Sequence, residues 1–546
     1  MLVAEAVGRA LAACGVECAF GVVGSGNFHL TNALVAAGVR FVAARHEGGA
    51  AVMADAYART SGRLGVVTVH QGPGLTNALT GIAEAAKSRT PMVVLAADTG
   101  AAGARSNFRL DQAALAAAVG AAHERAATAE SAVEDVLRAV RRAVVERRTV
   151  LVSLPLDVQG GQIDGAGEPA ARPLPAPPVL APDPGAVASL ADLLQGARRP
   201  VLVAGRGARE PRAAAAIAEL ARRCGALLAT SAVAKGLFNG DPWYVDVSGG
   251  FASPAAAERI AAADAVVAFG CTLNMWTTRH GRLLGPGAAV AQVDVDADAL
   301  HANPRVTLGV LGDAGATATA VADLLSARGH AAEGYRAEAL PSMRWRDVAY
   351  EDEGGDGRID PRTLSIGLDD LLPAQRTVAV DSGNFMGYPS MYLAVPDSAG
   401  FCFTQAFQSI GLGLSTAVGA ALARPDRLTV AALGDGGFLM GISELETVVR
   451  LGLPMVIVVY DDAAYGAEVH HFGPDGHPLD TVVFPDVDLA AIARGYGCAA
   501  ATVREPADLA AVSDWLAGPR DRPLLIDAKV AAARGSWWLE EAFQGH

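Results

Sequence analysis

The segment from Gly434 to Gly466, GDGGFLMGISELETVVRLGLPMVIVVYDDAAYG, carries carboxylates at both of its ends. Asp435 follows one apolar run, and Asp461 and Asp462 close the next one. This pattern predicts a strand, a helix and a second strand, and neighbouring parallel strands end at the same edge of a sheet. Asp435 and Asp462 should therefore lie close together. Paired carboxylates favour a divalent cation, and oxygen ligands suit Mg²⁺ or Ca²⁺.

The glycines around Asp435 indicate what that cation would accompany. Gly434, Gly436 and Gly437 let the backbone approach a ligand closely, and a helix that begins at this turn presents free amides to an anion. A diphosphate fits that arrangement, and it would repel the two carboxylates unless a cation lay between them. A solvated turn is the ordinary explanation for an isolated Gly-Asp-Gly, and the second acidic strand end argues against it.

The elements that must position these residues follow from the rest of the chain. Short β-branched runs alternate with Ala- and Leu-rich helical patterns, as in LGVVTVH, NALTGIAEAAKS and PMVVLAA. Two breaks divide the chain, a proline-rich segment over Glu168–Ala186 and a charged, glycine-rich segment over Ala349–Pro361. We therefore predict an α/β protein of three doubly wound parallel-sheet domains, at 1–165, 186–327 and 359–546. Ligands bind outside the carboxyl ends of such strands, where Asp381, Asp435 and Asp462 lie.

Composition narrows the partners and the compartment. The 546 residues are 51% hydrophobic and can form several cores, and a formal net charge of −14 argues against a nucleic-acid partner. The six cysteines are scattered, which predicts buried, reduced thiols. Glu5 and Arg9 interrupt the apolar pattern that a signal peptide needs, and no apolar run reaches the roughly 18 residues of a membrane span. We expect a cytoplasmic enzyme with a small-molecule substrate and no membrane association.

The Gly-Asp-Gly motif and the later aspartate pair resemble the signature of the thiamine diphosphate-dependent enzymes. The resemblance implies that the side chains of Asp435 and Asp462 and the carbonyl of Ala464 bind Mg²⁺. It implies that Gly434, Gly436, Gly437 and Tyr465 contact the cofactor, thiamine diphosphate. The family more often has asparagine where Asp461 and Asp462 stand. We therefore expect extra negative charge at this site, with tighter or altered metal binding.

Three further segments resemble the same family. RHEGGAA places Glu47 as the residue that would hydrogen-bond the pyrimidine nitrogen of the cofactor and so activate it. FQSIGLGLS places Ile410 as the apolar residue that would hold the two cofactor rings in a folded conformation, with Gln408 beside it. DSGNF resembles the second diphosphate loop, which contains Gly383, Asn384 and Phe385. The resemblance thus assigns a pyrimidine-binding first domain, a middle domain and a diphosphate-binding third domain.

Within the family, the closest general similarity is to acetolactate synthase, pyruvate oxidase and benzoylformate decarboxylase. It implies a 2-oxo acid substrate that loses carbon dioxide, after which the product is protonated or joined to a second carbonyl compound. His70 stands where benzoylformate decarboxylase-like enzymes have a proton-relaying histidine. Gln71, Gln112 and His470 are further catalytic candidates. In this group Glu47 and the metal loop come from different subunits, so a homodimer is the minimal unit and a homotetramer is expected.

The preferred hypothesis is an acetolactate synthase-like lyase or transferase. The alternatives are a benzoylformate-type decarboxylase and a 2-hydroxyacyl-CoA lyase, in which Arg206 and Arg209 would lie near a nucleotide. From another class, GVVGSGN (Gly21 to Asn27) could indicate a nicotinamide-dependent oxidoreductase, but it lacks the Gly-x-Gly-x-x-Gly spacing. The sequence leaves open the donor, the acceptor, the stereochemistry, and whether FAD or an ADP-containing group occupies the middle domain.

Overall fold

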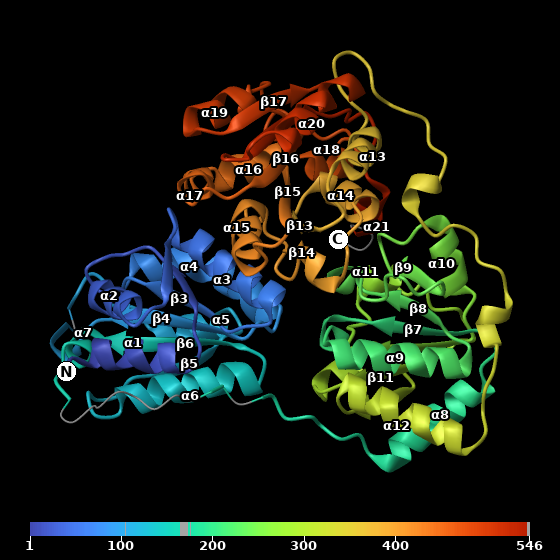
Figure 1. The fold of residues 1–546 in the computed structure, drawn as a ribbon, viewed down its shortest axis with the longest axis horizontal. Coiled ribbons are helices and arrows are strands. Elements are labelled where there is room, and N and C mark those ends of the chain that lie inside the picture. The colour runs from blue at the N-terminus through green and yellow to red at the C-terminus, as the bar shows by residue number, and fades with distance from the viewer. Residues whose placement is uncertain (104, 164–172, 175, 543–546) are drawn as a thin grey trace.

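The computed structural model describes residues 1–103, 105–163, 173–174 and 176–542. Three six-stranded parallel sheets, each covered by helices, follow one another along the chain and surround a common centre (Figure 1). The α/β prediction is confirmed. The runs of Val, Leu and Ala that predicted buried strands form strands such as Met92–Asp98 and Leu524–Lys529, which are buried along their whole length.

The first sheet has the strand order β2-β1-β3-β4-β6-β5. The strand order reverses between β1 and β3, and a ligand site is expected at that point. The strands are β1 (Cys18–Gly21), β2 (Arg40–Ala43), β3 (Gly65–Val69), β4 (Met92–Asp98), β5 (Ala122–Arg125) and β6 (Thr149–Pro155). The helices are α1 (Val3–Ala13), α2 (Phe28–Ala36), α3 (Glu47–Ser61), α4 (Pro73–Lys87), α5 (Gln112–Ala118), α6 (Ala132–Val145) and α7 (Leu156–Gln159).

The middle sheet has the order β12-β11-β10-β7-β8-β9, which is the strand order of dinucleotide-binding domains. Here the order reverses between β7 and β10. The strands are β7 (Pro200–Ala204), β8 (Leu227–Thr230), β9 (Tyr244–Val247), β10 (Ala265–Phe269), β11 (Ala289–Asp294) and β12 (Leu308–Leu311). The helices are α8 (Pro184–Gly196), α9 (Pro211–Cys224), α10 (Pro254–Ala261), α11 (Met275–Thr278) and α12 (Ala314–Ala327).

The third sheet, β14-β13-β15-β16-β18-β17, repeats the topology of the first. Its order reverses between β13 and β15, the strands that precede Asp381 and Asp435. The strands are β13 (Arg376–Val380), β14 (Phe401–Phe403), β15 (Leu428–Gly434), β16 (Met455–Asp461), β17 (Ala499–Val503) and β18 (Leu524–Lys529). The helices are α13 (Pro361–Leu371), α14 (Gly387–Tyr392), α15 (Gly413–Ala423), α16 (Asp435–Gly441), α17 (Glu444–Arg450), α18 (Gly466–Phe472), α19 (Leu489–Tyr496), α20 (Ala510–Ala517) and α21 (Trp537–Ala542).

The two predicted breaks fall between the sheets. Within Glu168–Ala186, residues 168–172 and 175 lie outside the described residues, and α8 begins at Pro184. Over Ala349–Pro361, the chain forms an isolated bridge between Gly355 and Arg358 before α13 begins at Pro361. Each of the ranges 1–165, 186–327 and 359–546 contains one sheet, and the exact boundaries stay a prediction.

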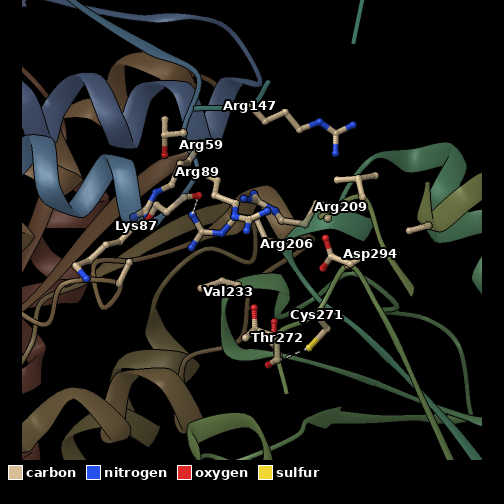
Figure 2. Close-up of a pocket in the computed structure, with 18 of the residues that line it drawn as sticks. Arg59, Lys87, Arg89, Arg147, Arg206, Arg209, Val233, Cys271, Thr272 and Asp294 are labelled. Carbon is tan, nitrogen blue, oxygen red and sulfur yellow. Dashed lines mark hydrogen bonds between the residues drawn. The ribbon is translucent and has the colours of Figure 1, made fainter. Parts of the chain in front are cut away.

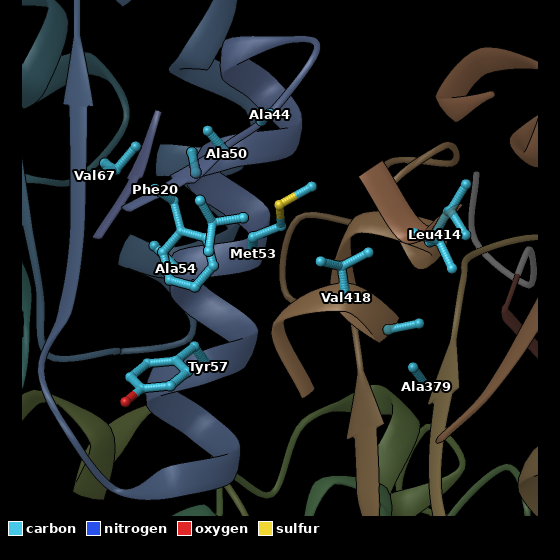
Figure 3. Close-up of a cluster of buried hydrophobic side chains, with 14 of the residues drawn as sticks. Phe20, Ala44, Ala50, Met53, Ala54, Tyr57, Val67, Ala379, Leu414 and Val418 are labelled. Atoms are coloured by element: carbon cyan, nitrogen blue, oxygen red, sulfur yellow. The ribbon is translucent and has the colours of Figure 1, made fainter. Parts of the chain in front are cut away.

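One hydrophobic core joins the first and third domains. Helix α3 packs against α15, with Met53 and Ala54 on one side and Leu414 and Val418 on the other (Figure 3). The two backbones approach so closely that a Cβ at Gly419 would collide with the Met53 carbonyl. This packing holds α3 against the third domain of the same chain.

Two predictions from composition can be compared with the structure. All six cysteines are free and buried, as predicted. Among the described residues, none of the helices is long and apolar enough to cross a membrane.

Candidate active site

The two aspartates predicted to bind a metal meet at the edge of the third sheet. Strands β15 and β16 are parallel neighbours with Gly434 opposite Tyr460, so Asp435 and Asp462 follow them on the same side. Asp435 is only 8% exposed, and its burial together with the charges of Asp462 and Asp461 raises its pKa to about 8. Burial also raises the pKa of Asp462 to about 6, while a hydrogen bond with Asp435 acts in the opposite direction. A divalent cation would relieve the repulsion between these buried acids.

The third aspartate, Asp461, faces away from this pair. Its Oδ2 accepts a hydrogen bond from Lys529 Nζ at 2.6 Å, and its Oδ1 accepts one from the Ala463 amide at 3.0 Å. The expected extra negative charge is therefore offset by a buried lysine 68 positions further along the chain. Strand β18 lies beside β16 and brings the lysine to this position, while the charge of Asp461 still contributes to the raised pKa of Asp435. The effect of the extra aspartate on metal binding stays a prediction. Among the described residues, no cluster of three or more His, Cys, Asp or Glu side chains could hold a metal, so a metal here would also need the Ala464 carbonyl or cofactor oxygens.

Glycines form a cradle beside the acid pair. Gly383 has φ of 136°, a conformation that favours glycine. A Cβ at Gly437 would lie 2.5 Å from Asp381 Oδ2, and a Cβ at Gly436 would lie 2.6 Å from the Tyr465 ring. The space beside these two glycines is filled by Asp381 and Tyr465, so neither position has room for a side chain. Their uncovered amides are of the kind that bind a diphosphate.

Asp381 ties together the two loops that border this cradle. Its carboxylate accepts amide hydrogen bonds from Ser382 at 2.9 Å, Gly411 at 2.9 Å and Leu412 at 3.2 Å. Burial raises its pKa to about 6, although these amides act in the opposite direction. Because Gly411 and Leu412 follow Ile410, Asp381 also fixes the loop that carries that half-buried isoleucine.

The DSGNF loop is held by residues that the sequence did not single out. The Ser536 hydroxyl donates to Asn384, and Trp538 Nε1 donates to the Asn384 carbonyl at 3.2 Å. Phe385 is buried and stacks on Tyr460 with ring centroids 5.2 Å apart. The adjacent residues Trp537 and Trp538 are the feature of the sequence that could have indicated a buried contact for this loop.

The catalytic candidates of the first domain gather at the strand ends of its sheet. Glu47 is the first residue of α3 and accepts a hydrogen bond from Asn77 Nδ2 at 3.1 Å. A Cβ at Gly74 would lie 3.1 Å from His70 Cβ and 3.4 Å from Glu47 Oε1, so these two side chains flank the same glycine. Asn77 was not identified from the sequence as a site residue, although it begins the NALTGIAEAAKS segment that predicted a helix.

His70 has a defined tautomer. Its Nδ1 lies 2.6 Å from the Gln71 carbonyl, which can only accept, so Nδ1 carries a hydrogen. Its Nε2 lies 3.2 Å from the Ser25 hydroxyl, and the Phe108 ring packs edge-on at 5.2 Å. Nε2 is therefore the nitrogen that can gain or lose a proton. Ser25 belongs to the GVVGSGN stretch, whose glycines indicate a nicotinamide site rather than a contact with His70.

The remaining candidates of the first domain, Gln71 and Gln112, are both buried. Gln71 is buried, and a Cβ at Gly26 would collide with its Oε1. Gln112 is buried within the first domain, where its Nε2 donates to the Ala97 carbonyl at 2.7 Å and its Oε1 accepts from Ser153 at 2.7 Å.

Two candidates of the third domain, Tyr465 and His470, lie at α18, whereas Gln408 lies elsewhere. Tyr465 precedes α18, its amide donates to the Val482 carbonyl at 2.8 Å, and its ring packs on Phe484. His470 lies in the last turn of that helix, with His471. Gln408, exposed and with φ of 64°, lines a different cavity at the junction of the domains.

That junction cavity has a volume of about 1200 Å³ and is bordered by all three domains. Figure 2 shows Arg59, Arg206 and Arg209 gathered within it. Burial and the nearby charge of Arg59 lower the pKa of Arg206 to about 10. Arg206 donates to the Ser88 carbonyl and Arg209 to the Ser398 carbonyl, each at 2.7 Å. Both acceptors are neutral, whereas Arg59 is paired with Asp55 at 3.3 Å and Glu84 at 3.4 Å.

Three protein-family models match this chain. The models of the thiamine pyrophosphate enzymes match in chain order: the N-terminal TPP binding domain at residues 1–121, the central domain at 187–321 and the C-terminal TPP binding domain at 381–528. The chain is a thiamine diphosphate-dependent enzyme.

Curated relatives of this thiamine diphosphate-dependent enzyme have several activities. Sulfoacetaldehyde acetyltransferase of Alcaligenes xylosoxydans xylosoxydans is 30% identical over 86% of this chain and 82% of its own length. A probable 2-ketoarginine decarboxylase AruI of Pseudomonas aeruginosa is 31% identical over 92% and 89%. Acetolactate synthase large subunits are also among the relatives.

A solved structure shows the same fold. The thiamine diphosphate-dependent 4-hydroxybenzoylformate decarboxylase of Rhodococcus jostii RHA1 superposes with a TM-score of 0.82, covering 97% of this chain and 99% of its own, at 22% identity. The family explains why a buried acid pair and a glycine cradle share one sheet edge. A glycine cradle fits a cofactor that carries a diphosphate.

Proposed function

We propose that this enzyme uses thiamine diphosphate and Mg²⁺ to break or form a carbon–carbon bond at a 2-oxo acid, as an acetolactate synthase-like lyase or transferase. When bound, the cofactor supplies a thiazolium carbon that adds to the 2-oxo group and lets carbon dioxide leave. The observation that carries the proposal is the buried pair of Asp435 and Asp462 beside the glycine cradle, at the point where the strand order of the third sheet reverses.

Different residues of this chain would bind the metal, the diphosphate and the rings of the cofactor. Asp435, Asp462 and the Ala464 carbonyl would hold Mg²⁺, while the turn amides around Gly436 would face the diphosphate. The loops that border the cradle would also contact the cofactor, through Gly383, Asn384, Phe385 and Tyr465. Ile410 lies on the loop that Asp381 anchors, which suits it to contact the cofactor rings. Glu47, oriented by Asn77, would receive the pyrimidine nitrogen and exchange a proton there.

Glu47 and the metal turn belong, in this proposal, to different subunits of a homodimer. Supporting this, Phe28, Leu439 and Met440 are large apolar residues that the single chain leaves 40–58% exposed, and the last two lie on α16, the helix that Asp435 begins. Mixing Glu47→Gln subunits with Asp462→Ala subunits tests it. If sites are shared, mixed dimers contain one intact site, and activity exceeds that of either variant alone. If each site belongs to one chain, no activity returns.

A benzoylformate-type decarboxylase is the second candidate, and His70 is the observation that favours it. Its Nδ1–H is held by the Gln71 carbonyl, so Nε2 is left to pass a proton, with the Ser25 hydroxyl beside it. Histidine can do this near neutral pH. Protonation would end the reaction as an aldehyde, whereas a transferase would deliver a second carbonyl compound to the same place.

The test of both candidates begins with the holoenzyme. Incubation with a panel of 2-oxo acids, with and without an acceptor aldehyde, followed by mass spectrometry of the products, identifies the reaction. His70→Ala should slow aldehyde release by about 10² to 10⁴ if it donates the proton, and should slow ligation less, so the ratio of ligated product rises. His330→Ala, just beyond the last helix of the middle domain, serves as a matched control. An unchanged product ratio at saturating cofactor would make His70 structural.

We also propose that the junction cavity binds the diphosphate of a nucleotide, either FAD or an ADP-containing group such as CoA. In support, Arg206 follows β7 and Cys271 follows β10, the two strands between which the order of the middle sheet reverses. An absorbance spectrum of the purified protein distinguishes a bound flavin from the alternatives. Calorimetry with FAD, ADP and CoA then identifies the class, and no binding of any of them would refute the proposal.

A further inference from the structure

Lys529 lies behind the metal turn and contacts the one aspartate of that turn that does not face the metal site. It ends β18, and Asp461 ends the neighbouring strand β16 directly opposite to it. Paired residues on adjacent strands project to the same face of a sheet, which places the two side chains in contact. Both residues are only 2% exposed, and Nζ lies 2.6 Å from Asp461 Oδ2.

The ammonium of Lys529 has acceptors for all of its hydrogens. Besides Asp461, it donates to Asp486 Oδ1 at 2.6 Å and to the Val487 carbonyl at 2.7 Å, and Asp527 Oδ2 lies 3.2 Å away. Burial acts to lower the pKa of Lys529, but the hydrogen bonds with Asp461 and Asp486 raise it to about 12. The lysine is therefore a permanent cation at this position.

The same lysine connects two segments that lie side by side. Residues 461–466 form the metal turn, and residues 482–487 run next to it, since Phe484 donates its amide to the Ala463 carbonyl at 2.8 Å and Ala464 bridges to Val483. Lys529 contacts the first segment through Asp461 and the second through Asp486 and Val487. Its charge and its geometry therefore both act on the turn that carries Asp462.

We infer that Lys529 is a positioning residue for the metal turn, which acts through Asp461: it offsets part of the charge of that carboxylate, which would otherwise add in full to the charge of Asp435 and Asp462 that a cation and a diphosphate meet. The inference rests on the proposed metal and cofactor site. It explains how this chain keeps an aspartate at 461, because Asp461 has a buried cation beside it, which it shares with Asp486 and Asp527.

Charge cancellation has a signature that a loss of packing does not share. Without Lys529, the uncompensated Asp461 carboxylate attracts Mg²⁺ and repels the diphosphate of the cofactor. Without the Asp461 carboxylate, one negative charge is lost behind the turn while Lys529 stays paired with Asp486 and Asp527, and both effects reverse. When both groups are neutral, the net charge returns to that of the wild type.

The experiment is a double-mutant cycle read by binding rather than by activity. Calorimetry measures Mg²⁺ binding without cofactor, and thiamine diphosphate binding at saturating Mg²⁺, for the wild type, Lys529→Met, Asp461→Asn and the double variant. Lys529→Met should bind Mg²⁺ more tightly and thiamine diphosphate more weakly, each by about threefold to tenfold, which is the range of one partly screened charge at short distance. Asp461→Asn should shift both affinities the other way, and the double variant should return to within about threefold of the wild type.

A matched control separates this effect from the loss of any buried lysine. Lys235 is also buried, and its ammonium donates to the Ser390 carbonyl in another part of the molecule. Lys235→Met should leave both affinities unchanged. If Lys529→Met does not fold, Asp461→Asn and the double variant still decide the question, because the second substitution must reverse the shifts of the first.

The possible results distinguish this inference from the function on which it rests. If the single substitutions shift both affinities in the same direction, or if the double variant is no closer to the wild type than the single ones, charge cancellation by Lys529 is refuted. If the wild type itself fails to bind thiamine diphosphate with Mg²⁺, the proposed function is overturned and this inference with it.

Discussion

Raising the pH from 6 to 8 should destabilise the metal-free protein through Asp435. Burial and the charges of Asp462 and Asp461 raise the pKa of this carboxyl from 3.8 to about 8 in the folded chain. Between those two values the folded protein keeps a proton that the unfolded chain has released. Stability therefore falls as the pH rises, by about 1.4 kcal/mol per pH unit, until the folded pKa is passed.

The window from pH 6 to 8 isolates this residue from its neighbours. Burial raises the pKa values of Asp381, Asp462 and Asp527 only to about 6, so most of their effect is complete at the lower limit. Asp435 should then cost the folded state about 2 kcal/mol over the window. The third domain, at 359–546, falls in the size range where 1 kcal/mol shifts the melting temperature by about 2 to 4 °C, so a loss of about 2 kcal/mol should lower it by about 4 to 8 °C.

The assay is thermal unfolding in a chelator at pH 6, 7 and 8, followed by circular dichroism. Asp435→Asn in the same buffers provides the reference, because the amide does not titrate and the rest of the protein is unchanged. The wild type should lose more stability than the variant over this window, and Mg²⁺ should restore the wild type at pH 8, since the cation stabilises the ionised pair. Parallel melting curves for the two proteins would refute the argument.

The remaining predictions concern the cofactor and the two domains that hold it. Thiamine diphosphate should bind only with a divalent metal, and equal affinity in calorimetry with excess chelator would contradict the metal assignment. Asp462→Ala should weaken that binding far more than Asp461→Ala, because Asp461 is already paired with Lys529; similar losses would refute the distinction. Glu47→Gln should keep the cofactor affinity while kcat falls by about 10² to 10⁴, and a rate within about twofold of the wild type would remove Glu47 from the mechanism. Gly436→Ala should reduce cofactor affinity, since its Cβ would lie 2.6 Å from the Tyr465 ring, and unchanged binding would show that the turn can open.

The sequence determined the architecture and one corner of the site because both depend on short-range patterns. Alternating buried strands and helices define parallel sheets, and a strand–helix–strand unit brings its two strand ends to one edge. The proximity of Asp435 and Asp462 follows from that rule alone, as the pairing of β15 with β16 shows. The glycines around them follow from the same local need for an open backbone.

Only the tertiary structure decided which distant groups form hydrogen bonds with each candidate residue. The partner of Asp461 is Lys529, the partner of Glu47 is Asn77, and the loop carrying Ile410 is held by Asp381. Each of these contacts joins separate segments of chain, and it depends on strand order and on the packing of loops. Hydrophobic periodicity reports which face of an element is buried, but not which other element covers it. That is why the sequence predicted the extra aspartate at the metal turn, while only the pairing of β16 with β18 placed a buried lysine beside it.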